Sequence, residues 1–170
     1  MEYELIRTQR KSVALRLLPD GSLVVRAPQR LPRQVLDALV EEKRVWIETR
    51  REQLRRHALL YPEPDAEEEA ALRRLAREQL PGLVERYADR MGVRPTGLRV
   101  TSARGRFGSC SGKNSLSFSW RLLRYPREAV EAVVVHELAH IRHKNHQKEF
   151  YAFVLSVMPD YYERIRLLKR

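Results

Sequence analysis

The pattern His136-Glu137-Leu138-Ala139-His140, at the end of an apolar run, constrains this chain more than any other segment. Residues four apart lie on one face of an α-helix, so His136 and His140 can direct their rings at the same metal ion. Glu137 points off that face, where its carboxylate can reach a water held by the ion. The pattern therefore predicts a helix with two metal ligands and a general base, as in zinc hydrolases.

The residues before this pattern favour a buried helix. Residues 129–135 contain a single polar side chain, and Pro126 stands where the start of a helix tolerates proline. A buried helix must satisfy the polar groups of its histidines and glutamate, and a metal ion would do so. We therefore expect a catalytic zinc ion with three protein ligands and a fourth position left for water.

The third ligand is expected from the residues that follow. His146 lies six positions after His140, and a continuous helix would turn it about 240° away from the first rings. The helix is therefore predicted to stop at Lys144-Asn145, because asparagine tolerates the left-handed conformation and can also cap a following helix. His146 would then lie in the first turn of a second helix, whose apolar residues continue to Pro159.

Two carboxylates compete with His146 for the role of third ligand. Glu149 follows it by one turn, and Glu163 lies far enough downstream to be the glutamate ligand of a different zincin type. The spacing of the three histidines also equals that of the metzincin pattern, but His143 occupies the place of the metzincin glycine. We interpret His143, and His57 far upstream, as solvated surface histidines.

Six short motifs form a series along the second half of the chain: Arg106-Phe107-Gly108-Ser109-Cys110, Pro126, His136-Glu137-Leu138-Ala139-His140, Asn145-His146, Phe150-Tyr151 and Pro159-Asp160-Tyr161. This series resembles the YgjP-like family of bacterial zinc metallopeptidases, which is similar to the SprT-like proteases. The resemblance implies that His136, His140 and His146 bind zinc. It also implies that Glu137 is the catalytic base and that the substrate is a protein or peptide.

The chain departs from the family pattern at three positions. Phe107 replaces a tryptophan, and Gln147 and Tyr151 stand in the places of a serine and a tryptophan. None of these positions is an implied ligand. The N-terminal part also looks like the family, because a basic β-hairpin is followed by a helix with a tryptophan, so the resemblance spans nearly the whole chain.

The predicted fold class is α+β and zincin-like: a small antiparallel sheet packs on the metal-binding helix, preceded by an N-terminal β-hairpin and helices. Residues 1–60 are expected to form the hairpin and a helix, and residues 61–170 the catalytic region, within one compact unit. Alternating apolar residues around Pro19-Asp20-Gly21 predict the hairpin. A helix follows Pro32 with Leu36, Leu39, Val40, Lys43 and Ile47 on one stripe, and Trp46 is expected in the core.

A second helix is predicted from Asp65, where Asp65 and Glu68 resemble a capping box, to Gly92. Pro81-Gly82 should kink or break it. Residues 98–104 and 114–120 read as paired strands, and the glycines between them permit tight turns near a site. In a zincin, the edge of such a sheet pairs with an extended peptide substrate.

Four further side chains are considered for roles at the site. Arg106 is either a structural arginine or a group that steadies an oxyanion or binds a substrate carboxylate or phosphate. Tyr161 or Tyr162 is a candidate for polarising the substrate oxygen. Cys110 is interpreted as a packed structural thiol rather than a metal ligand.

Composition limits the setting in which the protein works. With a single cysteine, no internal disulfide forms, which together with the absence of an apolar leader favours a cytoplasmic location. No apolar stretch is long enough to span a membrane. The net charge of +11 attracts polyanions, so nucleic acid or nucleotides are possible partners beside an arginine-rich, solvated surface.

These features predict a zinc-dependent metallopeptidase in which Glu137 deprotonates a zinc-activated water that attacks a peptide carbonyl. One alternative keeps the metal centre and changes the substrate to a nucleotide phosphoanhydride. Another is a nucleic-acid-binding module with a structural metal, which would need a fourth protein ligand, for which Cys110 is the sole thiol.

Overall fold

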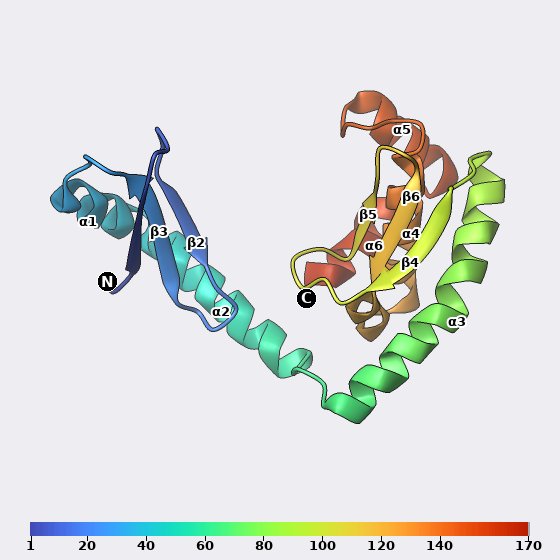
Figure 1. The fold of residues 1–170 in the computed structure, drawn as a ribbon, viewed down its shortest axis with the longest axis horizontal. Coiled ribbons are helices and arrows are strands. Elements are labelled where there is room, and N and C mark those ends of the chain that lie inside the picture. Colours follow the sequence, from blue (N-terminus) through green and yellow to red (C-terminus); the bar gives the residue numbers. More distant parts are fainter. Residues whose placement is uncertain (170) are drawn as a thin grey trace. The chain divides into compact units, whose positions relative to one another are not determined.

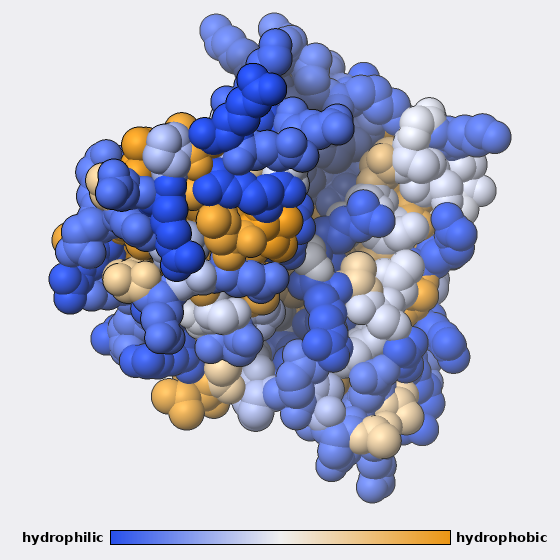
Figure 2. Space-filling view, turned by 60° about the vertical axis from the view of Figure 1, so that its left-hand side comes forward, coloured by the Kyte–Doolittle hydropathy of each residue, from blue (hydrophilic) through white to orange (hydrophobic). Residues whose placement is uncertain are grey.

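The computed structural model describes residues 1–169, and the chain divides into two compact units after Glu63. Each unit combines a three-stranded sheet with helices, so the predicted α+β class is confirmed. Hydrophilic residues cover most of the face shown in Figure 2, in keeping with the 33 lysine and arginine residues of the chain. Within residues 1–169, no helix has both the length and the apolar character needed to cross a membrane.

The N-terminal unit is built on a sheet with the strand order β1-β3-β2 (Figure 1). Strands β2 (Ala14–Leu17) and β3 (Leu23–Pro28) form the predicted antiparallel hairpin, and Gly21 adopts a positive φ of 83° in its turn. The sequence did not predict strand β1 (Glu4–Thr8), which pairs with β3 in parallel. The hairpin strand β3 therefore becomes the central strand of the sheet.

Two helices, α1 (Arg33–Glu42) and α2 (Arg44–Leu60), pack on this sheet, whereas the sequence predicted one helical stripe continuing past Lys43. The core of the unit consists of Leu23, Val25, Ala27, Leu36, Val40 and Ile47. The prediction of Trp46 as a core residue is wrong, because its side chain is 49% exposed. Ile47 takes the core-facing position, and successive helical residues point about 100° apart.

The C-terminal unit opens with the long helix α3 (Ala66–Met91). The carboxylate of Asp65 accepts a hydrogen bond from the backbone N–H of Glu68, as the predicted cap requires, and Gly92 ends the helix in the left-handed conformation. The helix continues through Pro81 without the predicted break. Pro81 lies on the exposed side of α3, so packing of the buried side holds the helix together.

The second sheet has the strand order β4-β6-β5 and consists of β4 (Gly97–Thr101), β5 (Gly108–Cys110) and β6 (Ser115–Ser119). The prediction of an antiparallel sheet is wrong in part, because β4 and β6 pair in parallel while β5 and β6 pair antiparallel. The reason is the short strand β5, which the sequence did not predict. It occupies the far edge, and β6 returns between β5 and β4. A 3₁₀ helix, Trp120–Arg124, follows β6.

Helix α4 (Arg127–Ala139) is the centre of the C-terminal unit and begins directly after Pro126, as predicted. It contacts α3, β5, α5 (Lys148–Val157) and α6 (Tyr161–Arg166), and a 3₁₀ turn, Leu167–Lys169, ends the described chain. Figure 1 shows α4 and α6 behind the β4-β6-β5 sheet. Nine of the thirteen residues of α4 are buried, so any polar group on this helix must find a partner inside the protein.

One carboxylate on α4, Glu131, joins three helices. Its Oε1 accepts hydrogen bonds from Arg86 of α3 (2.8 Å) and from Arg127 (3.2 Å). Its Oε2 accepts from the Tyr87 hydroxyl (3.0 Å) and from Arg164 of α6 (2.8 Å). Burial raises the pKa of Glu131, but the hydrogen bonds from Tyr87 and the arginines outweigh burial and bring that pKa below its ordinary value.

We predict that Glu131→Gln destabilises the protein by about 2 kcal/mol at pH 7, because it removes the charge from a set of partly buried ion pairs. Since the folded-state pKa is lowered, this stabilisation is present above the unfolded pKa of about 4 and is lost as pH falls through the folded value. Urea unfolding at pH 7 and at decreasing pH measures both effects. Glu128→Gln, an exposed position on the same helix, is the control. Equal stability of the Glu131 variant and wild type at pH 7 would contradict the prediction.

Candidate metal centre

Helix α4 ends at the candidate site. Its last turn carries His136, and His140 stands at its C-cap with helical dihedral angles. Three N–H groups then donate back to the end of the helix, from Ile141 to Leu138 and from Arg142 and His143 to Ala139. This tight turn redirects the chain immediately after the second histidine.

His146 reaches the same place from the segment before α5. It does not lie in the first turn of that helix, as the sequence predicted, because α5 begins two residues later. The predicted left-handed stop at Asn145 is also wrong, since Asn114 is the one non-glycine residue of the described chain with positive φ. Asn145 instead takes its alternative role near the next helix, where its side-chain oxygen accepts a hydrogen bond from the N–H of Gln147 (3.4 Å).

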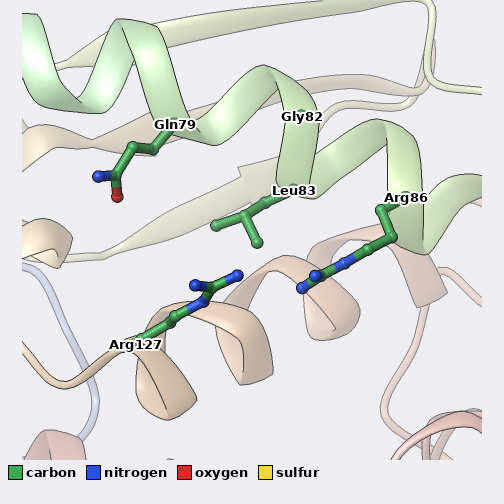
Figure 3. A pocket seen from close by; sticks show the side chains of 5 residues that line it. All are labelled: Gln79, Gly82, Leu83, Arg86 and Arg127. Atoms are coloured by element: carbon green, nitrogen blue, oxygen red, sulfur yellow. The ribbon is translucent and has the colours of Figure 1, made fainter.

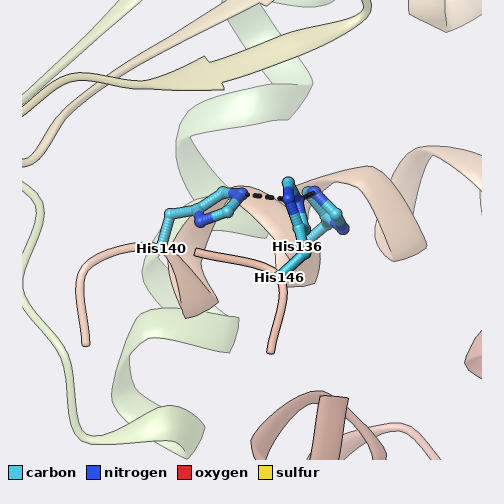
Figure 4. Close-up of side chains that lie close together, drawn as sticks. All are labelled: His136, His140 and His146. Atoms are coloured by element: carbon cyan, nitrogen blue, oxygen red, sulfur yellow. Dashed lines mark hydrogen bonds between the residues drawn. The ribbon is translucent and has the colours of Figure 1, made fainter. Parts of the chain in front are cut away.

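The three imidazole rings converge through their Nε2 atoms (Figure 4). Nε2 of His146 lies 3.0 Å from Nε2 of His136 and 3.1 Å from Nε2 of His140. These histidines form a group whose ligand atoms all lie within 4.8 Å of one another. The competing carboxylates Glu149 and Glu163 are not members of this group.

The donor set fits a metal ion. Nδ1 of His140 lies 2.9 Å from the carbonyl oxygen of His143, which only accepts, so Nδ1 carries the proton and Nε2 presents a lone pair toward the other rings. Nδ1 of His136 lies 2.8 Å from the hydroxyl of Tyr161. Tetrahedral zinc with nitrogen ligands at about 2.0–2.1 Å separates those nitrogens by about 3.3 Å, close to the observed spacing.

Burial keeps two of the rings neutral, which a ligand requires. Burial, together with the neighbouring His140 and His146, lowers the pKa of His136 to about 4. Burial also lowers the pKa of His140, against the hydrogen bond to His143. Both rings are therefore uncharged at neutral pH, and each has one lone pair available for a cation.

Glu137 occupies a buried position beside the group. Its side chain is 7% exposed and packs directly on strand β5, where a Cβ atom added to Gly108 would lie 2.6 Å from its Cγ. Burial raises the pKa of Glu137 to about 7, while Arg106 and a backbone hydrogen bond with Cys110 act in the opposite direction. Only glycine leaves room for this carboxylate against the strand.

The candidate residues around β5, Arg106 and Cys110, are not members of the histidine group. Arg106 is exposed and acts on Glu137 through its charge. Cys110 is not part of the histidine group; its half-buried thiol lies 4.0 Å from Nζ of Lys144, and burial raises its pKa. Lys144 also binds the side-chain oxygen of Asn114 (2.5 Å), which ties the segment before His146 to the β5–β6 turn.

The two remaining histidines lie outside the group of three. His143 and His57 are half-buried rather than fully solvated; the ring of His143 lies near Phe153 and that of His57 near Tyr61. A pocket of about 340 Å³ lies between α3 and α4 (Figure 3), lined by Gln79, Gly82, Leu83, Arg86 and Arg127. Its two arginines bind Glu131, and it contains none of the residues that the sequence motifs predict for the site.

Comparison with known proteins identifies the family to which this chain belongs. A family model described as "YgjP-like, metallopeptidase domain" matches residues 11–71 and 63–170, which covers the C-terminal unit and most of the N-terminal one. The histidine group thus lies in a metallopeptidase domain. The chain belongs to the YgjP-like family, as its motifs indicate.

No curated protein sequence gives a significant match. Among solved structures, the metallopeptidase zymogen of Pyrococcus abyssi abylysin is similar to 52% of this chain and 92% of its own, with 22% sequence identity and a TM-score of 0.46. This similarity is too distant to support an inference about the site.

We predict that Gly108→Ala lowers peptidase activity at least about tenfold while the metal content is retained, because the new methyl group displaces Glu137 and not the histidines. The matched control is Gly112→Ala in the adjacent turn, where an added Cβ meets nothing within 4 Å. Peptide cleavage rates and metal analysis of both variants make the test. Full activity of the Gly108 variant would show that Glu137 is not held against β5.

Proposed function

We propose that this protein is a zinc-dependent metallopeptidase of the zincin type. His136, His140 and His146 would hold the metal, and Glu137 would be the catalytic base. The observation that carries the proposal is the convergence of three Nε2 atoms at 3.0–3.1 Å beside one buried carboxylate. Membership of a metallopeptidase family supports the same reaction.

Zinc is the metal that best suits three imidazole ligands and an open fourth position. When bound, it lowers the pKa of a coordinated water to about 7 and polarises the substrate carbonyl. The tautomer of His140 is set by the carbonyl of His143, which leaves Nε2 available. Neither Cys110 nor any carboxylate of residues 1–169 joins the group, which favours a catalytic centre over a closed structural one.

Glu137 is suited to move a proton in both directions. Its carboxylate would take the proton of the attacking water and return it to the leaving amine, and burial, which raises the pKa of Glu137, helps it to hold that proton in between. Contact with Gly108 and the hydrogen bond with Cys110 hold the carboxylate in one position. A fixed base reduces the entropy lost on reaching the transition state.

A peptide substrate is favoured by the position of β5. This strand forms one edge of its sheet and contacts α4, so its outer backbone groups lie beside Glu137. An extended peptide that added to this edge would pass the base and the histidine group. Arg106, exposed at the start of this segment, would bind a carboxylate of the substrate or steady a developing oxyanion.

A second candidate reaction is hydrolysis of a nucleotide phosphoanhydride. The exposed charge of Arg106 next to Glu137, in a chain of net charge +11, favours this alternative. Incubation with unfolded protein and with nucleoside triphosphates separates the two. We expect new peptide fragments, and release of pyrophosphate without fragments would establish the alternative.

Glu137→Gln should reduce peptide cleavage by at least about a thousandfold and leave the zinc content unchanged, because the amide cannot accept the proton and does not bind the metal. Turnover of a fluorogenic peptide and elemental analysis of the same preparation test this. A variant that loses zinc would identify Glu137 as a ligand and overturn its assignment as base.

His146→Ala should weaken zinc binding by at least about a hundredfold, since one of three ligands is removed. Competition with a chromogenic chelator gives the dissociation constant. Glu163→Ala and Glu149→Ala serve as matched controls and should bind zinc as wild type does. If Glu163→Ala weakens binding and His146→Ala does not, the third ligand is Glu163.

A further inference from the structure

The hydroxyl of Tyr161 lies against the metal-binding histidine furthest inside the protein. It is 2.8 Å from Nδ1 of His136, the two rings are stacked with an interplanar angle of 15°, and Tyr161 is 4% exposed. We propose that Tyr161 is a positioning residue that accepts a hydrogen bond from Nδ1–H of His136 and thereby directs Nε2 at the metal. This inference rests on the proposed zinc site.

The direction of this hydrogen bond follows from the neighbouring contacts. The carbonyl of His143 requires a proton on Nδ1 of His140, so Nε2 of His140 can only accept. Nε2 of His140 is therefore free to bind a cation, and it lies 3.1 Å from Nε2 of His146, the neighbouring ligand atom.

The same reasoning reaches His136. Nε2 of His136 lies 3.0 Å from Nε2 of His146, so it is the atom of this ring that would bind the metal, and it must supply a lone pair. The proton of His136 must then be on Nδ1, where the hydroxyl of Tyr161 receives it. The contact with Tyr161 thus favours the tautomer of His136 that binds a metal through Nε2.

A phenol is a less restrictive partner than a carbonyl, so its own position must be fixed. Tyr161 is the first residue of α6, and its N–H donates to the carbonyl of Met158 (3.1 Å). Arg164, one turn later, binds both Asp160 and Glu131 of α4 at 2.8 Å. The Glu131 ion pairs thus hold α6 against the helix that carries His136 and keep the hydroxyl at Nδ1.

This contact also decides between two roles for the tyrosine. The sequence suggested that Tyr161 or Tyr162 polarises the substrate oxygen. The Tyr161 hydroxyl is instead directed at His136, in the interior of the unit. Removing it should therefore act on the metal, as loss of the group that orients a ligand does.

The test compares Tyr161→Phe with Tyr162→Phe, a matched loss of a hydroxyl from the adjacent residue, whose ring is 46% exposed and stacks on Tyr151. Chelator competition measures the zinc dissociation constant of both variants. We expect binding to weaken about 10–100-fold in Tyr161→Phe and to remain within twofold of wild type in Tyr162→Phe. Equal affinity in Tyr161→Phe and wild type would overturn the proposal.

A second measurement separates positioning from simple packing. Nitrogen NMR of the histidine rings in metal-free wild-type protein should show the proton of His136 on Nδ1. In Tyr161→Phe this preference should be reduced, whereas His140, held by the carbonyl of His143, should not change. A proton on Nε2 of His136 in wild type would refute the assignment.

These two readouts need no substrate, so they test Tyr161 independently of the proposed function. If zinc affinity and tautomer change as expected but no peptide is cleaved, the positioning role stands and the peptidase proposal fails. If peptide is cleaved and neither readout changes in Tyr161→Phe, the proposed function stands and the positioning role fails.

Discussion

The burial of helix α4 is the constraint on which the C-terminal unit depends. Three ionisable side chains on this helix enter an interior that cannot solvate them, and each is satisfied by residues of neighbouring elements. Glu131 is bound by arginines of α3 and α6, His136 faces Tyr161 of α6, and Glu137 lies on β5. The packing of the unit and the geometry of the site therefore have the same origin.

Strand β5 is short, but it contributes directly to the candidate site. It is three residues long, yet it provides the glycine surface under Glu137 and the free edge of the sheet. The sheet is mixed because β5 and β6 form a hairpin whose second strand enters between β5 and β4. The N-terminal sheet has the same topology: in both sheets the third strand lies in the middle, parallel to the first strand and antiparallel to the second.

The arginines of this protein differ in their pairing and in their exposure. Many arginines are paired with acidic residues along the helices, for example Arg44 with Glu41 and Glu48, while Arg106 remains exposed beside the candidate base. In the proposed function, a cation at that point would attract anionic groups of a substrate toward the site. Binding of nucleic acid or nucleotides through the basic surface stays a prediction.

The sequence by itself was enough to predict the helix that carries His136 and Glu137, the hairpin around Gly21 and the caps of α3. These features depend on the periods of helices and strands and on local turn chemistry. Tertiary structure decided the rest. Strand β1 pairs with the distant strand β3, and the three residues of β5 are too few for a period of two to reveal them. Trp46 is exposed because its neighbour Ile47 takes the core-facing position. The convergence of His146 and the contact between Tyr161 and His136 join segments ten and twenty-five residues apart in the chain, and no local periodicity encodes such distances.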